Sequence, residues 1–412
     1  MNRFEEFTTR FVQQVGKKEG AISPVMVNSA SFGYGNSETG EGIFEGSIKK
    51  PLYARVGNPT SAQLEQILAS MDGGVGAITA STGMGAIAMA TMSLLRSGDE
   101  IISIGGLFGG TYSYFSETLT RFGIRTKFFD VDEFSSIEEA VNTATKIIFL
   151  ESVGNPNMRL PDIAKIAEIA KRHEIALIVD NTCTPLSISP LALGADIVVY
   201  STTKVITGNA SALGGAAIYR AIDEGGDKFK AERYRDIQPF IKKMGATALI
   251  GVAKKRALRD FGMSANGFGS YMTMLGLETL PLRLDRIVTT VETVARGLYA
   301  KGFNVNHPCL PHHPHHERYL SQFANGCGTI LTIDMGTKEA AFAFLNRSKL
   351  ITITANIGDS RTLGLHMAST IYRDFEDSVK EFLGITPGLI RISIGLENAE
   401  AILDDFIYAA QI

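Results

Sequence analysis

The chain has 412 residues, of which 45% are hydrophobic and 20% charged, and it contains 42 glycines. This composition is typical of a soluble α/β enzyme and argues against a disordered or fibrous chain, while the length suggests two domains. Forty basic and 43 acidic residues leave a net charge of −3, which gives no reason to expect nucleic acid or an anionic membrane as a partner.

Two further absences bear on location. The N-terminal stretch "MNRFEEFTTRFVQQVGKKEG" lacks the apolar core of a signal peptide, and no run of about 18 apolar residues occurs that could span a membrane. We therefore expect a cytoplasmic protein.

The first part of the chain predicts an arm followed by a large α/β domain. Residues 1–55 include "SFGYGNSETGEGIFEGS", which has little apolar content for a core, so we expect them to pack on something else. Within residues 56–255, helical patterns such as 160–174 separate short apolar runs. These runs are rich in β-branched residues, and their apolar residues do not alternate with polar ones. This pattern is typical of strands buried on both faces. They are 100–106, 126–132, 145–152, 175–181 and 195–201. The repetition predicts a mostly parallel sheet with helices on both faces.

After about residue 225 the pattern changes, and residues 256–412 are expected to form a smaller α+β domain. Segments 240–263 and 280–302 each predict one long helix, and segments 328–336 and 389–397 predict strands.

The cysteines and histidines give little indication of a metal site. Cys183, Cys309 and Cys327 are too scattered for a disulfide framework or a zinc site, so we expect small buried side chains. The cluster "HPCLPHHPHHERY" (307–319) has prolines and irregular spacing, which favours a solvated loop over a metal centre.

Ionisable residues end several predicted strands, at the edge where parallel sheets bind ligands. Glu151, Asp180 and Lys204 each follow such a run. A lysine among small residues in a partly dry pocket can react with an aldehyde, and pyridoxal phosphate is the aldehyde cofactor that uses this chemistry. Asp180 would keep its ring nitrogen protonated. Gly83 and Met84 open a helix whose N–H groups would hold its phosphate.

The stretches "YARVGNPT", "STGMGAI", "ESVGNPN", "VDNTCTP", "YSTTK" and "PGLIRISIGLEN" occur in this order. Together they resemble the successive signatures of the Cys/Met-metabolism, or trans-sulfuration, family of pyridoxal-phosphate enzymes. The resemblance implies the fold-type-I transferase architecture, with residues 56–255 binding the cofactor. It also implies a homotetramer of dimers that share active sites, with the arm packing on a neighbouring subunit.

The resemblance implies a role for each matching residue. Lys204 would form the Schiff base and carry protons, and Asn155 would lie near the cofactor's 3-hydroxyl. Arg391 would bind the substrate α-carboxylate, with Asn356 nearby. The implied phosphate ligands are Gly83, Met84, Ser201 and Thr203, joined by Tyr53 and Arg55 from a neighbouring subunit.

Two reactions share all of these residues: γ-replacement on an O-acylated homoserine by sulfide or a thiol, and C–S elimination. Three features resemble those of the O-acetylhomoserine sulfhydrylases more than those of the lyases. They are the sequence of segment 259–286, the length of the stretch before it, and Asn356. Phe108 stands where relatives carry a tyrosine that stacks on the cofactor and handles protons. Either Tyr112 or Tyr114 substitutes, or an acetate leaving group needs no acid, or the reaction has shifted. A catalytically impaired cofactor-binding protein is the third alternative.

Overall fold

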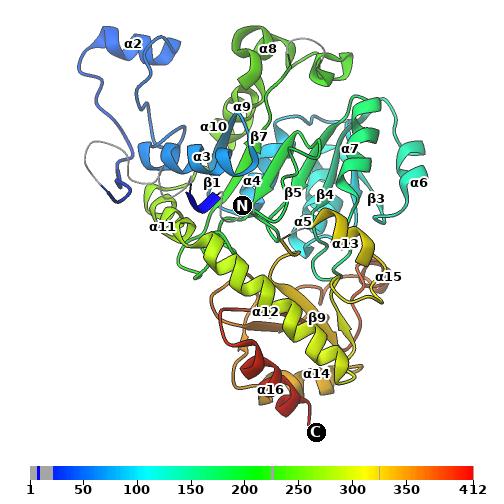
Figure 1. Cartoon of the computed structure of the whole chain (residues 1–412). Helices are drawn as coiled ribbons and strands as arrows, with labels where there is room; N and C mark the ends of the chain where they lie inside the picture. Colours follow the sequence, from blue (N-terminus) through cyan, green and yellow to red (C-terminus); the bar gives the residue numbers. More distant parts are fainter. Residues whose placement is uncertain (1–6, 10–21, 224–226, 324, 412) are drawn as a thin grey trace.

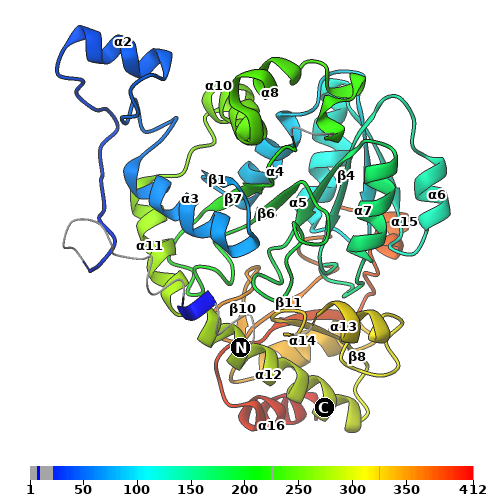
Figure 2. The ribbon, with the colours of Figure 1, turned by 45° about the horizontal axis from the view of Figure 1, so that its top comes forward.

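The computed structural model describes residues 7–9, 22–223, 227–323 and 325–411. Two sheets organise these residues, a large one in the upper body of the molecule and a smaller one below it, joined by the long helix α12 (Leu280–Ala300) (Figures 1 and 2). Among the described residues, no helix is both long and apolar enough to cross a membrane.

The large sheet has the strand order β1-β7-β6-β5-β4-β2-β3. All pairs from β6 to β3 are parallel, whereas β7 runs antiparallel to both β6 and β1. The predicted fold class, a mostly parallel sheet covered by helices, is therefore confirmed. The strand bounds are β1 Gly76–Ala80, β2 Glu100–Ile104, β3 Arg125–Phe129, β4 Thr145–Glu151, β5 Ala176–Asp180, β6 Ile197–Tyr200 and β7 Gly215–Tyr219.

Successive residues of the central strands face two separate cores. In β5, Leu177 and Val179 pack into one cluster with helices α3 (Pro59–Asp72) and α7 (Ile163–Arg172). Ala176 and Ile178 pack into the other cluster with α4 (Gly83–Met92). Because both faces are covered, these strands carry no polar alternation.

Two expectations about this sheet differ from the structure. β3 lies at the edge of the sheet, next to β2, so its residues are partly exposed rather than buried on both faces. Strands β1 and β7 were not predicted. Their sequences "GAITA" and "GAAIY" consist largely of small residues, which carry a weak strand signal.

The segment 240–263 was predicted to be one long helix. It forms instead a series of short helices and turns. Helix α8 (Gln238–Met244) ends at Gly245, whose φ of 52° and ψ of −128° break the helix. After a 3₁₀ turn, helix α9 (Ala248–Ala253), a π turn and α10 (Arg259–Phe261) follow. Their apolar residues, including Leu249 and Leu258, pack on the same core as α4.

The smaller sheet has the order β10-β11-β12-β9-β8. Its strands are β8 Val305–Asn306, β9 Ile330–Asp334, β10 Thr352–Ile353, β11 Leu363–His366 and β12 Leu389–Ser393. The predicted strands at 328–336 and 389–397 are thus confirmed, as is the helix now labelled α12. The accompanying helices are α11 Gly267–Glu278, α13 His316–Gln322, α14 Lys338–Arg347, α15 Asp377–Phe382 and α16 Ala399–Ala410.

The histidine cluster is not the solvated loop that we expected. His307, His313 and His315 are each at most 5% exposed. Ring nitrogens of these three residues accept backbone N–H groups: that of Cys309 for His307, that of His315 for His313, and that of Leu160 for His315. The histidines therefore satisfy buried backbone groups, a use that the irregular spacing did not reveal.

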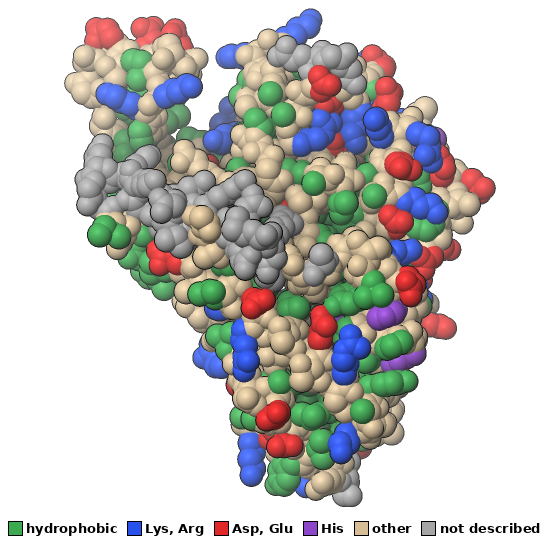
Figure 3. Space-filling model, viewed as in Figure 1, with side chains coloured by type: hydrophobic (Ala, Val, Ile, Leu, Met, Phe, Trp, Pro, Cys, Tyr) green, Lys and Arg blue, Asp and Glu red, His purple; other side chains and the backbone are tan. Residues whose placement is uncertain are grey.

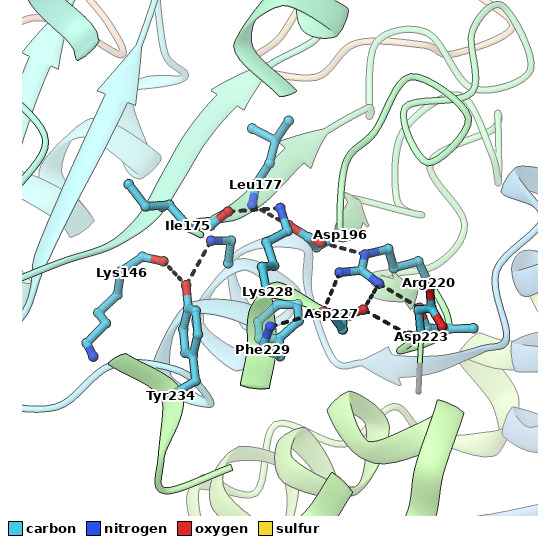
Figure 4. Close-up of polar contacts among 12 residues, drawn as sticks. Lys146, Ile175, Leu177, Asp196, Arg220, Asp223, Asp227, Lys228, Phe229 and Tyr234 are labelled. Carbon is cyan, nitrogen blue, oxygen red and sulfur yellow. Dashed lines mark hydrogen bonds and ion pairs between the residues drawn. The ribbon is translucent and has the colours of Figure 1, made fainter. Parts of the chain in front are cut away.

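A buried ionic network joins β5, β6 and β7 at the end of the sheet where β5 and β6 begin (Figure 4). The Asp196 carboxylate, which has no exposed surface, forms ion pairs with Arg220 at 2.6 Å and with Lys228 at 2.7 Å. It also accepts the backbone N–H of Leu177 at 2.7 Å. Arg220 extends the network to Asp227.

The part of the arm around helix α2 (Ser37–Glu45) stands apart from the body of the molecule (Figures 1 to 3), whereas Phe7 packs into the core of the body. Helix α2 was not predicted, and Asn36 caps it by accepting the N–H of Thr39. Large apolar side chains of the arm remain exposed, including Ile22 and Phe44 at 91% and 72%.

Candidate active site

The main candidate site is a cavity of about 210 Å³ between the carboxyl ends of the central strands and the smaller sheet. Cavities of roughly 150 Å³ can hold a benzene ring, so this one has room for a substituted ring. The structure brings most of the predicted site residues to its lining. They are Gly83, Met84, Phe108, Asn155, Asp180, Ser201, Thr203, Lys204 and Arg391.

Lys204 lies in the turn after β6, and its ammonium group points toward the smaller sheet. Its Nζ donates to Oδ1 of Asn356 at 2.8 Å. Burial, with a contribution from the positive charge of Arg391, lowers the pKa of Lys204 to about 8. About a tenth of the amine is therefore unprotonated at pH 7, compared with less than about a thousandth for an ordinary lysine, which suits a nucleophile or a proton carrier.

Asp180 ends β5 and pairs in register with Glu151 at the end of β4. Burial raises the pKa of Asp180 to about 6, against a hydrogen bond from the backbone N–H of Thr182 that favours the carboxylate. The group is therefore mostly ionised at neutral pH and can hold a cation in the cavity.

Glu151 also lines the cavity, and burial and the charge of Asp180 raise its pKa well above the usual range. Its Oε1 accepts the backbone N–H of Phe108 at 2.7 Å. Glu151 thereby fixes the segment that carries Phe108. We singled out Glu151 as a strand end but assigned it no role.

The start of α4 presents backbone donors that suit an anion. Thr82 caps the helix by accepting the N–H of Gly85 at 2.9 Å, and the first N–H groups of the helix face the cavity end. A Cβ on Gly83 would lie 2.5 Å from Cβ of Ser201, so only glycine permits this approach. The hydroxyl of Thr203 is engaged with the backbone of Gly214.

Arg391 on β12 is a buried cation at the other side of the cavity. It donates to Oδ1 of Asn155 at 3.1 Å and to the carbonyl of Asn356 at 3.4 Å. Burial lowers its pKa. In the part of the chain that the structure describes, no carboxylate forms an ion pair with it. Such a cation suits an incoming carboxylate.

Three predicted residues do not line the cavity. Asn356 contacts two lining residues, accepting from Lys204 through its side chain and from Arg391 through its carbonyl. Tyr53 and Arg55 are exposed and lie on the arm side, where Arg55 hydrogen-bonds the carbonyl of Arg259 and lies 5.9 Å from the Tyr53 ring. They contribute nothing to the cavity of their own chain.

Neither tyrosine considered as a substitute at Phe108 reaches the cavity. The Tyr112 ring stacks on Phe128 at 4.6 Å, and the Tyr114 hydroxyl lies 3.2 Å from that of Thr91. Sequence reasoning missed Thr182 and Cys183 as lining residues. Their position within two or three residues of Asp180 was the available signal.

Comparisons with known proteins agree with this geometry. The model of the family described as "Cys/Met metabolism PLP-dependent enzyme" matches residues 8–411. O-acetyl-L-homoserine sulfhydrylase 1 of Thermus thermophilus is 36% identical, covering 85% of this chain and 86% of the relative. L-methionine gamma-lyase of Pseudomonas putida is 30% identical, covering 98% and 97%.

A solved structure extends the likeness to three dimensions. It is a Campylobacter jejuni protein assigned as O-acetylhomoserine (thiol)-lyase, 30% identical, which covers 100% of both chains with a TM-score of 0.92. That protein carries a pyridoxyl-lysine monophosphate.

The cavity fits this cofactor on its own chemistry. The glycine at position 83 leaves backbone N–H groups open to a phosphate, the Lys204 amine can react with an aldehyde, and Asp180 can hold a protonated ring nitrogen. The chain belongs to the Cys/Met-metabolism family of pyridoxal-phosphate-dependent enzymes.

Proposed function

We propose that this enzyme catalyses γ-replacement on O-acetylhomoserine or a similar O-acylhomoserine. Sulfide or a small thiol displaces the acyloxy group and gives homocysteine or methionine. We also propose a cytoplasmic homotetramer of dimers, in which each active site is completed by Tyr53 and Arg55 of a neighbouring subunit. Their exposure on the arm side, away from their own cavity, supports that part of the proposal.

The cofactor, when bound, acts as an electron sink for a carbanion at the substrate α-carbon. Lys204 would anchor the cofactor and would move protons, for which a pKa of about 8 is suited. Asp180 would hold the ring nitrogen, and Gly83, Met84, Ser201 and Thr203 would hold the phosphate. Asn155 would serve the 3-hydroxyl.

Residues from the smaller sheet and its loops orient the substrate. Arg391, a buried cation that forms no ion pair with any described carboxylate, binds the α-carboxylate. Asn356, which accepts from Lys204, keeps the amine aligned with the substrate carbons from which it takes protons. The two residues are linked through the backbone carbonyl of Asn356.

One observation favours replacement over elimination: no tyrosine of this chain lines the cavity, within the residues described, and Phe108 occupies the ring position. A carboxylic acid has a pKa near that of a glutamate side chain, about 4.3, whereas a thiol has one near 8.5. Acetate therefore leaves without a proton donor. A methanethiolate leaving group needs one, and Phe108 cannot supply it.

A C–S lyase of the methionine or cystathionine γ-lyase type is the alternative. It is supported because a relative named as a sulfhydrylase and one named as a methionine γ-lyase are similar to this chain to a comparable degree. A cofactor-binding protein with impaired catalysis is the second alternative, and it is motivated by Phe108 alone.

The deciding experiment incubates the cofactor-loaded protein with O-acetylhomoserine, with and without sulfide, and separately with methionine. Homocysteine that forms only with sulfide is the expected result. 2-Oxobutanoate formed from methionine without an acceptor would make the enzyme a lyase. Bound cofactor without turnover of any amino acid would favour the impaired protein.

A further inference from the structure

A row of buried polar side chains lies behind the cavity, and none of its five members lines the cavity. Each member is at most 5% exposed. We call this row the Tyr200 network, and its members are Ser152, Thr184, Asn181, Tyr200 and Asp72.

Three members of the Tyr200 network stand at the ends of central strands, and each is next in sequence to a cavity residue. The pairs are Ser152 with Glu151 at the end of β4, Asn181 with Asp180 at the end of β5, and Tyr200 with Ser201 at the end of β6. Successive side chains of a strand point to opposite sides. The network therefore lies on the reverse side of the strand ends that carry the cavity residues.

The directions of the hydrogen bonds in the Tyr200 network follow from its one acid. An ionised carboxylate only accepts, and the Tyr200 hydroxyl donates to Oδ2 of Asp72 at 2.5 Å. The Tyr200 oxygen therefore accepts the Nδ2–H of Asn181, at 2.8 Å. This orients the Asn181 amide, whose Oδ1 accepts from the Thr184 hydroxyl at 2.6 Å. Because the Thr184 proton is thus engaged, Ser152 donates to Thr184, at 2.7 Å.

The Tyr200 network connects the strands at the point where their backbone pairing ends. The N–H of Ser152 donates to the carbonyl of Asp180 at 2.9 Å, and that of Asn181 to the carbonyl of Val199 at 3.0 Å. Past these bonds, the side chains of the network continue the connection from β4 across β5 to β6. Asp72, the last residue of α3, extends it to that helix.

We propose that Tyr200 and Asn181 are positioning residues, which hold the ends of β5 and β6 in the arrangement that the cofactor needs. Asp180 then stands at a fixed separation from Ser201, the first for the ring nitrogen and the second for the phosphate. Because all the side-chain bonds point towards one carboxylate, each polarises the next, and the loss of one weakens the others. The proposal rests on the proposed roles of Asp180 and Ser201 toward the cofactor.

The test compares two buried tyrosines that lie at opposite ends of the same strands. Tyr234 is 1% exposed, as is Tyr200. Its hydroxyl accepts the N–H of Ala176 at the start of β5 and donates to the carbonyl of Lys146 in β4 (Figure 4). Tyr200→Phe and Tyr234→Phe each remove one buried hydroxyl that makes hydrogen bonds on two sides. We therefore expect the two variants to show similar shifts of the urea midpoint of the cofactor-free chain.

Only Tyr200→Phe should change the cofactor site. The dissociation constant of pyridoxal phosphate, measured by equilibrium dialysis at one fixed pH, should rise about fivefold to tenfold, as expected for the loss of one hydrogen bond. The visible circular dichroism of the bound cofactor at saturation should change too, because the ring and the phosphate are held differently. Tyr234→Phe should leave the circular dichroism unchanged and the dissociation constant within about twofold.

A second variant cuts the network at another bond. Thr184→Val keeps the shape of the side chain and removes the hydroxyl that lies between Ser152 and Asn181. It should weaken cofactor binding as Tyr200→Phe does. In the double variant the affinity should fall by less than the product of the two single losses, because the second change acts on a network that is already cut. If Tyr200→Phe does not fold, Thr184→Val takes its place in the comparison with Tyr234→Phe.

Four outcomes would overturn the proposal. Wild-type affinity and circular dichroism in Tyr200→Phe would remove the positioning role, and an equal loss of affinity in Tyr234→Phe would attribute the effect to stability alone. Losses that multiply in the double variant would mean that the two hydroxyls act separately. Wild-type affinity in Asp180→Asn would refute the role of Asp180 on which the proposal rests, whatever Tyr200→Phe shows. None of these measurements depends on which amino acid the enzyme converts.

Discussion

Phe108 places a ring at the cavity without a group that can donate a proton. Its backbone N–H is held by the buried Glu151, so the position of the ring is set by the chain rather than by a hydroxyl contact. The structure therefore offers a fixed ring position at which a proton donor can be introduced.

We expect Phe108→Tyr to raise the elimination of methionine by about 10- to 100-fold, because a positioned acid typically contributes about 10²-fold or more. The reaction of O-acetylhomoserine with sulfide should change less than about threefold, since acetate leaves unprotonated. Steady-state rates of 2-oxobutanoate and homocysteine formation measure the two. An equal change in both rates would mean that the leaving group is not what position 108 controls.

The start of α4 depends on close contact between two elements. Gly83 lies so near Ser201 that a Cβ would meet Cβ of Ser201 at 2.5 Å and its hydroxyl oxygen at 2.8 Å. Gly215 of β7 makes a similar approach, where a Cβ would lie 2.1 Å from the carbonyl of Thr82. Glycine at these positions allows the helix N-terminus to approach both neighbouring strands.

Gly83→Ala should therefore open the phosphate site. We expect the affinity for pyridoxal phosphate to fall at least about tenfold and the free energy of unfolding to fall by about 1 to 3 kcal/mol, as for other overpacked sites. Equilibrium dialysis of the cofactor measures the affinity, and urea unfolding measures the free energy of unfolding. Gly33→Ala is the control, because a Cβ there meets nothing within 4 Å. Wild-type affinity in Gly83→Ala would contradict the close approach.

Elements with a strong local signal were predictable from the sequence, and those shaped by their neighbours were not. The central strands and α12 follow from continuous apolar runs and helical spacing. β7 is made of small residues because α4 packs close to it, which only the assembled fold reveals. Likewise, Lys204 and Asp180 were visible as strand ends, whereas the contact of the Thr182 hydroxyl depends on the backbone N–H of Ser201, 19 residues away.

The buried ionic network holds strand ends together on the edge opposite the cavity. Asp196→Asn would leave Arg220 and Lys228 without their shared buried charge. We expect the free energy of unfolding to fall by roughly 3 kcal/mol or more, as when one partner of a buried pair is removed. Glu232→Gln is the control, since its pair with Arg235 is exposed and should change stability by less than about 0.5 kcal/mol. Equal urea midpoints for the two variants would contradict a stabilising role of the network.

At the scale of the whole molecule, the cavity needs both sheets, because Arg391 comes from the smaller one and Asp180 and Lys204 from the larger. One apolar cluster runs continuously through both parts, joining Leu177 to Ile392. The two sides of the cavity are therefore held in a fixed relation by packing. The arm, in contrast, leaves Ile22 and Phe44 exposed.

If Tyr53 and Arg55 complete the site of a neighbouring subunit, two inactive variants should rescue each other. Lys204→Ala and Arg55→Ala each damage every site of their own assembly. In random mixed dimers, however, one site combines an intact Lys204 with an intact Arg55. Co-expression should then restore about one quarter of the wild-type active sites. Cofactor absorbance and turnover of the purified mixture measure the recovery.

Lys204→Ala mixed with Asp180→Asn is the control, because both residues line one cavity and no mixed site has both intact. No recovery in the first mixture would mean that Arg55 acts within its own chain, through its contact with the Arg259 carbonyl.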